Sequence, residues 1–138
     1  MKTKVQFSNI RIKQHPKHRV TVCTLWADPN IWYIDNNVLM STLTKVLLKP
    51  EFKHLDQFGR FDVTAVTRCS ILDDFDEEKG KKIAILKAKY KAFKVFFKLW
   101  KAIMKELDKD SEEAEQYMYA CFNAAMHEDK YFNKIIEE

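Results

Sequence analysis

Glycine, proline and cysteine are all scarce in this chain of 138 residues, which has two, three and three of them. A loop that cradles phosphate groups needs several closely spaced glycines, and no such run is present. The three cysteines are odd in number and far apart, which favours reduced thiols over a disulfide framework. Neither they nor the four histidines have the spacing of zinc ligands. We therefore expect no metal site and no cofactor.

Long apolar runs are also missing, and the N-terminal residues are polar rather than signal-like. We therefore expect a soluble, cytoplasmic protein without membrane contact. Hydrophobic residues make up 46% of the chain and aromatic residues 13%, which excludes intrinsic disorder. The length suits one domain, with residues 1–70 forming mainly strands and residues 73–138 mainly helices.

No catalytic signature is present. A nucleophilic enzyme needs a Ser or Cys with a positioned base, and the sequence has no Gly-x-Ser-x-Gly or Cys-His pattern. We therefore do not expect an enzyme.

Charge is distributed unevenly along the chain. The net charge is +4, residues 1–25 contain Lys and Arg but no acid, and residues 106–138 are rich in Asp and Glu. A basic N-terminal part indicates an anionic partner, of which nucleotides and nucleic acid are the obvious classes.

Alternating and β-branched residues predict strands over 4–13, 20–26, 31–34 and 60–69, the first with a bulge at Ser8-Asn9. Residues 38–48 favour a short helix that ends before Pro50. A helix is expected from about residue 111 to His127. Because strands come first and helices last, we predict an α+β fold. An N-terminal antiparallel sheet of about four strands would pack against a long central helix and a shorter C-terminal helix.

The long helix extends to about residue 109 and carries a stripe of lysines spaced alternately four and three residues apart. The stripe consists of Lys87, Lys91, Lys94, Lys98, Lys101 and Lys105. Most of the remaining circumference is apolar, so the helix needs cover on more than one side. We interpret the stripe as a solvated face, with a nucleic-acid track as the alternative. Gly80 either admits a close backbone approach or is tolerated near a fraying end.

Acidic residues gather where this helix begins. Asp73, Asp74 and Asp76 could hold Mg²⁺ or act as acid and base, but capping of the helix N-terminus explains them more simply.

Several basic residues and one aromatic residue are candidates for a ligand site. Arg11 and Arg19 belong to the first hairpin and Arg68 closes the last strand, so charge-assisted hydrogen bonds to phosphate are expected there. Phe75 lies in a polar turn, where it could stack on a base. The alternative is that Phe75 is a hydrophobic staple and that the cations serve solubility.

A longer pattern accompanies these candidates, with the opening Lys4-Val-Gln-Phe-Ser-Asn-Ile-Arg and His15-Pro-x-His before it. It reads Cys69-x3-Asp73-x-Phe75-Asp76-x3-Gly80-x2-Ile83-Ala84-x2-Lys87-Ala88. It resembles a signature of the phage anti-Thoeris sponge family, the first type of Thoeris anti-defence protein. One position departs from the pattern, since Leu86 stands where we expect Asn or Arg.

The resemblance implies a non-enzymatic phage protein in the cytoplasm of an infected bacterium. Such proteins sequester cyclic ADP-ribose isomers made by TIR-domain enzymes, and some also hold cyclic oligonucleotides. The family is oligomeric, with pockets between subunits. Here it implies that Phe75 stacks on adenine and that arginines neutralise the pyrophosphate.

We accordingly predict a homo-oligomer that sequesters a cyclic nucleotide messenger. The predicted ligand-binding residues are Phe75, Arg68, Arg11, Lys87, Asp74 and Arg19. The alternatives are a nucleic-acid-binding accessory protein and an inhibitor that docks on a host protein.

Overall fold

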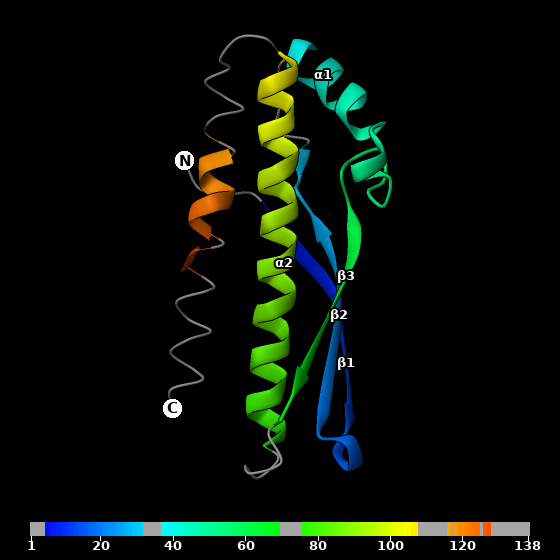
Figure 1. The fold of residues 1–138 in the computed structure, drawn as a ribbon, viewed down its shortest axis with the longest axis vertical. Coiled ribbons are helices and arrows are strands. Elements are labelled where there is room, and N and C mark those ends of the chain that lie inside the picture. The colour runs from blue at the N-terminus through cyan, green and yellow to red at the C-terminus, as the bar shows by residue number, and fades with distance from the viewer. Residues whose placement is uncertain are drawn as a thin grey trace.

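The computed structural model describes residues 5–31, 37–69, 76–107, 116, 118–124 and 126–127. In these ranges the fold is α+β, as predicted: an antiparallel sheet in the order β1-β2-β3 packs against one long helix, α2 (Figure 1). The strands are β1 (Gln6–His15), β2 (Val20–Asp28) and β3 (Phe61–Arg68). Because β2 lies in the middle, β1 and β3 each have one edge that pairs with no other strand of the described residues, and we call it the free edge.

The predicted bulge in the first strand is confirmed. Ser8 is opposite Trp26 and Arg11 is opposite Thr24, so β1 carries one extra residue between these pairs. Asn9 adopts a positive φ of 55° at this point, which is a backbone state that Asn tolerates better than most residues. The bulge reverses which side chains of β1 face α2, so Phe7 and Ile12 both pack toward the core.

The described sheet has three strands rather than about four. Most of the predicted strand at 31–34 lies outside the described residues. Ile31 itself is described, and it is buried in a helical turn after the Asp28-Pro-Asn30 turn instead of pairing with β2. A short apolar run fits a buried turn as well as a strand, which is why periodicity could not separate them here.

The short helix predicted over 38–48 is confirmed as α1 (Asn37–Leu47). Leu39, Leu43 and Val46 recur at helical spacing and are buried in the core. The helix ends shortly before Pro50, which begins a separate 3-10 turn.

The long helix is α2 (Glu77–Glu106), which has 30 residues. Asp76 caps it, because its side chain accepts a hydrogen bond from the backbone N–H of Lys79. Six residues spaced four apart form a row that winds slowly around α2, by about 40° at each step. They are Gly80, Ala84, Ala88, Ala92, Phe96 and Trp100. All but Gly80 are buried in the core. The row therefore changes from very small side chains to large aromatic ones partway along the helix.

Gly80 allows the close approach that the sequence left open. A Cβ atom at this position would lie 2.6 Å from Oγ1 of Thr21, which is fully buried on β2. Gln14 ties the same corner together, since its Nε2 donates to Thr21 Oγ1 and to the carbonyl of Glu77. The start of α2 is thus docked directly on β1 and β2.

The side of α2 away from the sheet is also covered, as its wide apolar arc predicted. Residues 118–121 are helical and lie beside α2 opposite the strands (Figure 1). Phe122 contacts Phe97 of α2 with ring centroids 5.4 Å apart. Residues 111–115 of the predicted C-terminal helix lie outside the described residues.

Candidate anion-binding groove

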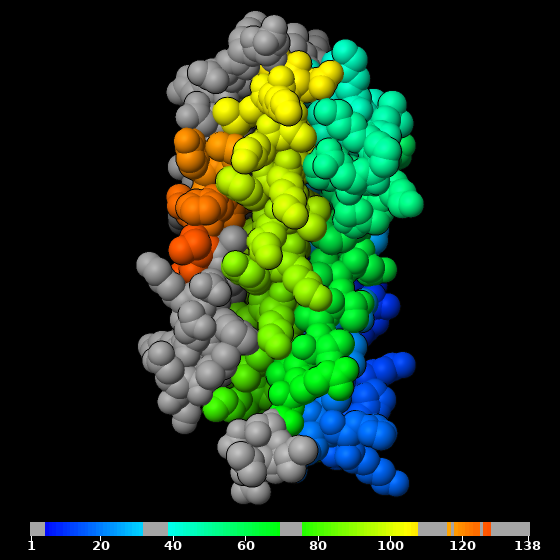
Figure 2. Space-filling model, in the orientation of Figure 1, coloured from blue at the N-terminus to red at the C-terminus, as the bar shows by residue number. Residues whose placement is uncertain are grey.

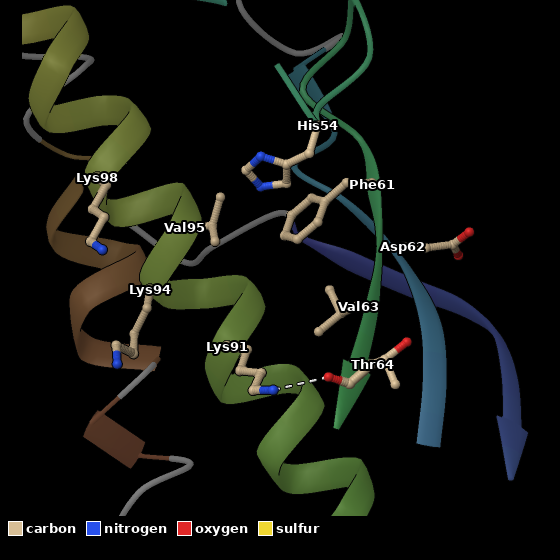
Figure 3. Close-up of a pocket in the computed structure, with 9 residues that line it drawn as sticks. All are labelled: His54, Phe61, Asp62, Val63, Thr64, Lys91, Lys94, Val95 and Lys98. Carbon is tan, nitrogen blue, oxygen red and sulfur yellow. Dashed lines mark hydrogen bonds between the residues drawn. The ribbon is translucent and has the colours of Figure 1, made fainter. Parts of the chain in front are cut away.

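An open groove of about 360 Å³ lies between α2 and β3. Figure 3 shows it, with Phe61 and Val63 pointing from β3 toward α2 and Asp62 pointing away. The helix supplies three lysines and one valine. The lining residues are His54, Phe61, Asp62, Val63, Thr64, Lys91, Lys94, Val95 and Lys98. We call this site the lysine groove.

Two lysines of α2 bind the free edge of β3, and one of them, Lys91, also lines the groove. Lys91 Nζ donates to the carbonyl of Thr64 at 3.0 Å, and Lys87 Nζ donates to the carbonyl of Val66 at 3.4 Å. The two contacts arise because α2 runs antiparallel to β3 and the four-residue spacing of the lysines nearly equals the two-residue spacing of the carbonyls. Four helical residues rise about 6.0 Å, and two strand residues span about 6.8 Å. Lysines four residues apart on α2 therefore reach carbonyls two residues apart on β3.

The series of lysines that contact the edge of β3 ends with Lys91, inside the groove. The next position in the series is Val95, and the next carbonyl on that edge of β3 belongs to Asp62. The row of packing residues changes at the same level of α2, from Ala92 to Phe96. Small side chains let the helix lie close to the sheet, and large ones hold it farther away. We infer that this change opens the groove.

Aromatic rings join one wall of the groove to the core. His54 meets Phe61 edge to face with centroids 5.2 Å apart, and Phe61 meets Phe96 in the same way at 5.6 Å. Phe96 is fully buried. Such pairs add about 0.5–1.5 kcal/mol to the burial of the rings themselves. The wall is therefore fixed to the scaffold, although His54 is exposed.

A tight turn before β3 positions this wall. The carboxylate of Asp56 accepts hydrogen bonds from the backbone N–H of Phe58 and Arg60 and from Arg60 Nε. Burial raises the pKa of Asp56, but these hydrogen bonds and the Arg60 charge outweigh it and lower the pKa below its ordinary value. Gly59 completes the turn with a φ of 77°.

The groove carries an excess of positive charge. Lys91, Lys94 and Lys98 line it together with a single carboxylate, that of Asp62. Asp62 forms an ion pair with Arg11 at 3.1 Å on the outer face of the sheet, so its charge is already matched. An anion with an apolar or aromatic part fits this arrangement. Its charge would meet the ammonium groups, and its ring would meet His54 and Phe61.

The structure does not bring the predicted basic residues together at one point. Arg11 lies opposite Thr24, whereas Arg68 lies opposite Val20, four residues farther along β2. Four strand residues span about 13 Å, and Arg11 is paired with Asp62, so the two guanidinium groups do not lie side by side in this structure. Lys87 lies on the β3 edge, one helical turn from the lysine groove.

Arg19 lies at the end of the hairpin near Arg68. Its guanidinium contacts Cys69 Sγ at 3.7 Å, and its carbonyl accepts a hydrogen bond from the Cys69 N–H. Phe75 and Asp74 lie outside the described residues. Leu86, the position that departs from the family pattern, is buried beside Ile83.

Sequence reasoning named the lysine stripe but not the groove that three of its members line. His54 and Phe61 were not among the candidates either. The stripe was the available signal, but the sequence did not show that β3 would lie against it. Figure 2 shows that α2 stays at the molecular surface along its length, and Lys101 and Lys105 are exposed as a solvated face requires.

No protein-family model, curated protein or solved structure matches this chain. Within the part of the chain that the structure describes, no three His, Cys, Asp or Glu side chains gather as a metal site would require. None of the described helices has the length and apolarity needed to cross a membrane.

Proposed function

We propose that this protein binds a phosphate-bearing cyclic nucleotide messenger in the lysine groove and holds it without cleavage. The observation that carries the proposal is that three lysines of α2 and an aromatic wall line one groove of about 360 Å³. That volume is at the lower end of the range typical of small-molecule sites. The resemblance to the anti-Thoeris sponges supplies the ligand class, which is the cyclic ADP-ribose isomers with cyclic oligonucleotides as a second group.

In this proposal the three lysines neutralise the phosphates. Charge-assisted hydrogen bonds to phosphate are shorter and stronger than neutral ones, and flexible lysines adapt to either ring size. A base would lie against Phe61 and His54. Arg68 and Arg19 would form a second, separate group for the ligand, and Phe75, outside the described residues, stays the predicted stacking residue. The proposal also includes assembly into a dimer or higher oligomer and action in the bacterial cytoplasm against host defence.

The test is isothermal titration of the purified protein with cyclic ADP-ribose isomers and cyclic trinucleotides. We expect submicromolar binding, and we expect heating to release the ligand intact. The decisive variant is Lys94→Gln with Lys98→Gln. Its matched control is Lys101→Gln with Lys105→Gln, which removes the same charge from the same stripe outside the groove. Only the first pair should weaken binding. Equal losses in both pairs would show that the groove is not the site.

Phe75→Ala separates the two groups of predicted contacts. Near-wild-type affinity in this variant would remove the stacking role from Phe75 and leave the lysine groove as the site. Light scattering of the same samples tests the oligomer.

Nucleic-acid binding is the second candidate, favoured by the length of the lysine stripe. From Lys87 to Lys105 the helix rises about 27 Å, so the stripe is long enough to contact more than one nucleotide of a strand. A short single strand in the same titration tests it. Affinity that falls steeply with salt and grows with strand length would favour this candidate over the cyclic nucleotide.

A further inference from the structure

We propose that the free edge of β3 binds an acidic peptide in an extended conformation, which adds to the sheet as a fourth strand beside α2. The proposal does not rest on nucleotide binding. A nucleotide needs the ammonium groups and the aromatic wall, whereas a peptide needs the backbone of β3. The two ligands can therefore be told apart by experiment.

The hydrogen bonds from the lysines show which backbone groups of β3 face outward. The carbonyls of Thr64 and Val66 accept from Lys91 and Lys87, so these residues direct their backbone groups away from β2. In an antiparallel sheet the N–H and C=O of one residue point to the same side. The N–H groups of Thr64 and Val66 therefore also face the free edge.

The groove gives such a strand a place to lie. It is bounded on one side by residues 61–64 of β3 and on the other by Lys91, Lys94, Val95 and Lys98. A strand added beside β3 would lie about 4.8 Å away and would direct every second side chain toward α2. Lysine side chains are flexible, so their ammonium groups can leave the carbonyls of β3 when a peptide binds. A neighbouring strand would have to separate along its whole length to do the same.

The charge of the helix selects the peptide. Lys91, Lys94 and Lys98 line the groove, Lys91 lies at the edge of β3, and Asp62 is already paired with Arg11. Acidic side chains at every second peptide position would meet these lysines, while Val95 offers an apolar contact between them. Strand addition of this kind takes its affinity from main-chain hydrogen bonds and its specificity from alternate side chains.

The probe is a fluorescein-labelled ten-residue peptide of alternating Glu and Thr, followed by fluorescence anisotropy. Its matched control is the same peptide N-methylated at its six central residues, which removes hydrogen-bond donors from both peptide edges and keeps every charge. We expect the control to bind at least about tenfold more weakly. A peptide of alternating Lys and Thr should bind more weakly still, because its charge is reversed.

Two protein variants complete the test. Thr64→Pro removes an outward N–H without removing a hydrogen bond to β2, and Thr64→Val keeps the backbone intact. We expect about a tenfold loss for the proline variant and none for the valine variant. Hydrogen exchange of wild-type protein gives a measurement that needs no variant, since bound peptide should slow exchange at Thr64 and Val66.

Equal binding of the plain and N-methylated peptides would overturn the proposal, because charge alone would then explain the affinity. Unchanged exchange at Thr64 and Val66 would do the same. A doubled mass in light scattering, with these amides protected before any peptide is added, would assign the edge to a second copy of the chain. Binding of a ten-nucleotide single strand in place of the peptide would assign the surface to nucleic acid.

Discussion

From Glu77 to Ala92 the helix α2 lies against the sheet through glycine and alanine, whereas from Phe93 to Glu106 it packs through large aromatic side chains. Lysines accompany both halves. In the first half Lys87 and Lys91 donate to carbonyls of β3, and in the second Lys94 and Lys98 line a groove. The lysines therefore lie in different environments in the two halves, because the packing residues of α2 change from glycine and alanine to large aromatic side chains.

The comparison of the two halves suggests that different residues of α2 determine the stability of the fold and the affinity for a ligand. The packing row should determine the free energy of unfolding, and the lysines of the second half should determine affinity. Four substitutions test that division, beginning with the largest effect on stability.

Phe96→Ala should break the second half of α2. Phe96 is fully buried and meets Phe61 edge to face, so its loss leaves a cavity beneath the groove wall. We expect the free energy of unfolding, measured by urea denaturation, to fall by about 3–5 kcal/mol. Phe122→Ala removes the same ring from a half-exposed position and should cost far less. Equal losses in the two variants would contradict the importance given to Phe96.

Gly80→Ala should strain the first half of α2. Alanine favours the helix by about 1 kcal/mol, but the new Cβ would lie 2.6 Å from Thr21 Oγ1 and overpack a buried site. Overpacking costs about 1–3 kcal/mol, so we expect a net loss of stability in thermal or urea unfolding. In a Thr21→Ala background the same substitution should become neutral or stabilising. A stabilised single variant would mean that the two elements are not in close contact.

Asp56→Asn should loosen the turn that positions the groove wall. The variant loses the charge that strengthens three hydrogen bonds, and we expect a loss of about 1 kcal/mol at pH 7. Because the folded pKa of Asp56 is lowered, its stabilisation is present above the usual carboxyl pKa and disappears as the pH falls through the folded value. The stability difference from wild type should therefore shrink in acid. A stability difference that stays constant down to pH 2 would show that the stabilisation does not come from the charge of the Asp56 carboxylate.

Lys94→Gln with Lys98→Gln should have the smallest effect on stability. Exposed lysines contribute little to folding, so we expect a change within about 0.5 kcal/mol in urea denaturation. Binding of a cyclic nucleotide should nevertheless weaken at least about tenfold, which Lys101→Gln with Lys105→Gln should not reproduce. A large loss of stability in the variant with Lys94→Gln and Lys98→Gln would contradict the claim that these lysines determine affinity and not folding.

The sequence predicted much of this fold because its signals were local. The bulge at Ser8-Asn9, the cap at Asp76 and the alternation of β3 each depend on a few neighbouring residues. The strand expected at 31–34 was different, because Ile31 lies in a buried turn and residues 32–34 lie outside the described residues. A four-residue apolar run carries no period that separates a strand from a buried turn.

The candidate site was less predictable, since it depends on contacts distant in sequence. The lysine stripe was visible, but its pairing with Thr64 and Val66 requires the position of β3 relative to α2. The row from Gly80 to Trp100 was present in the sequence and could have indicated where the helix separates from the sheet. Arg11 and Arg68 were assigned to one ligand because register was not available from the sequence.

The most direct test of the central claim is an NMR titration of protein labelled with ¹³C at the lysine Cε atoms, using one cyclic ADP-ribose isomer. We predict that the signals of Lys91, Lys94 and Lys98 shift with a common saturation curve while those of Lys101 and Lys105 stay in place. Shifts spread evenly over the stripe, or no shift at a saturating ligand concentration, would contradict a nucleotide site in the lysine groove.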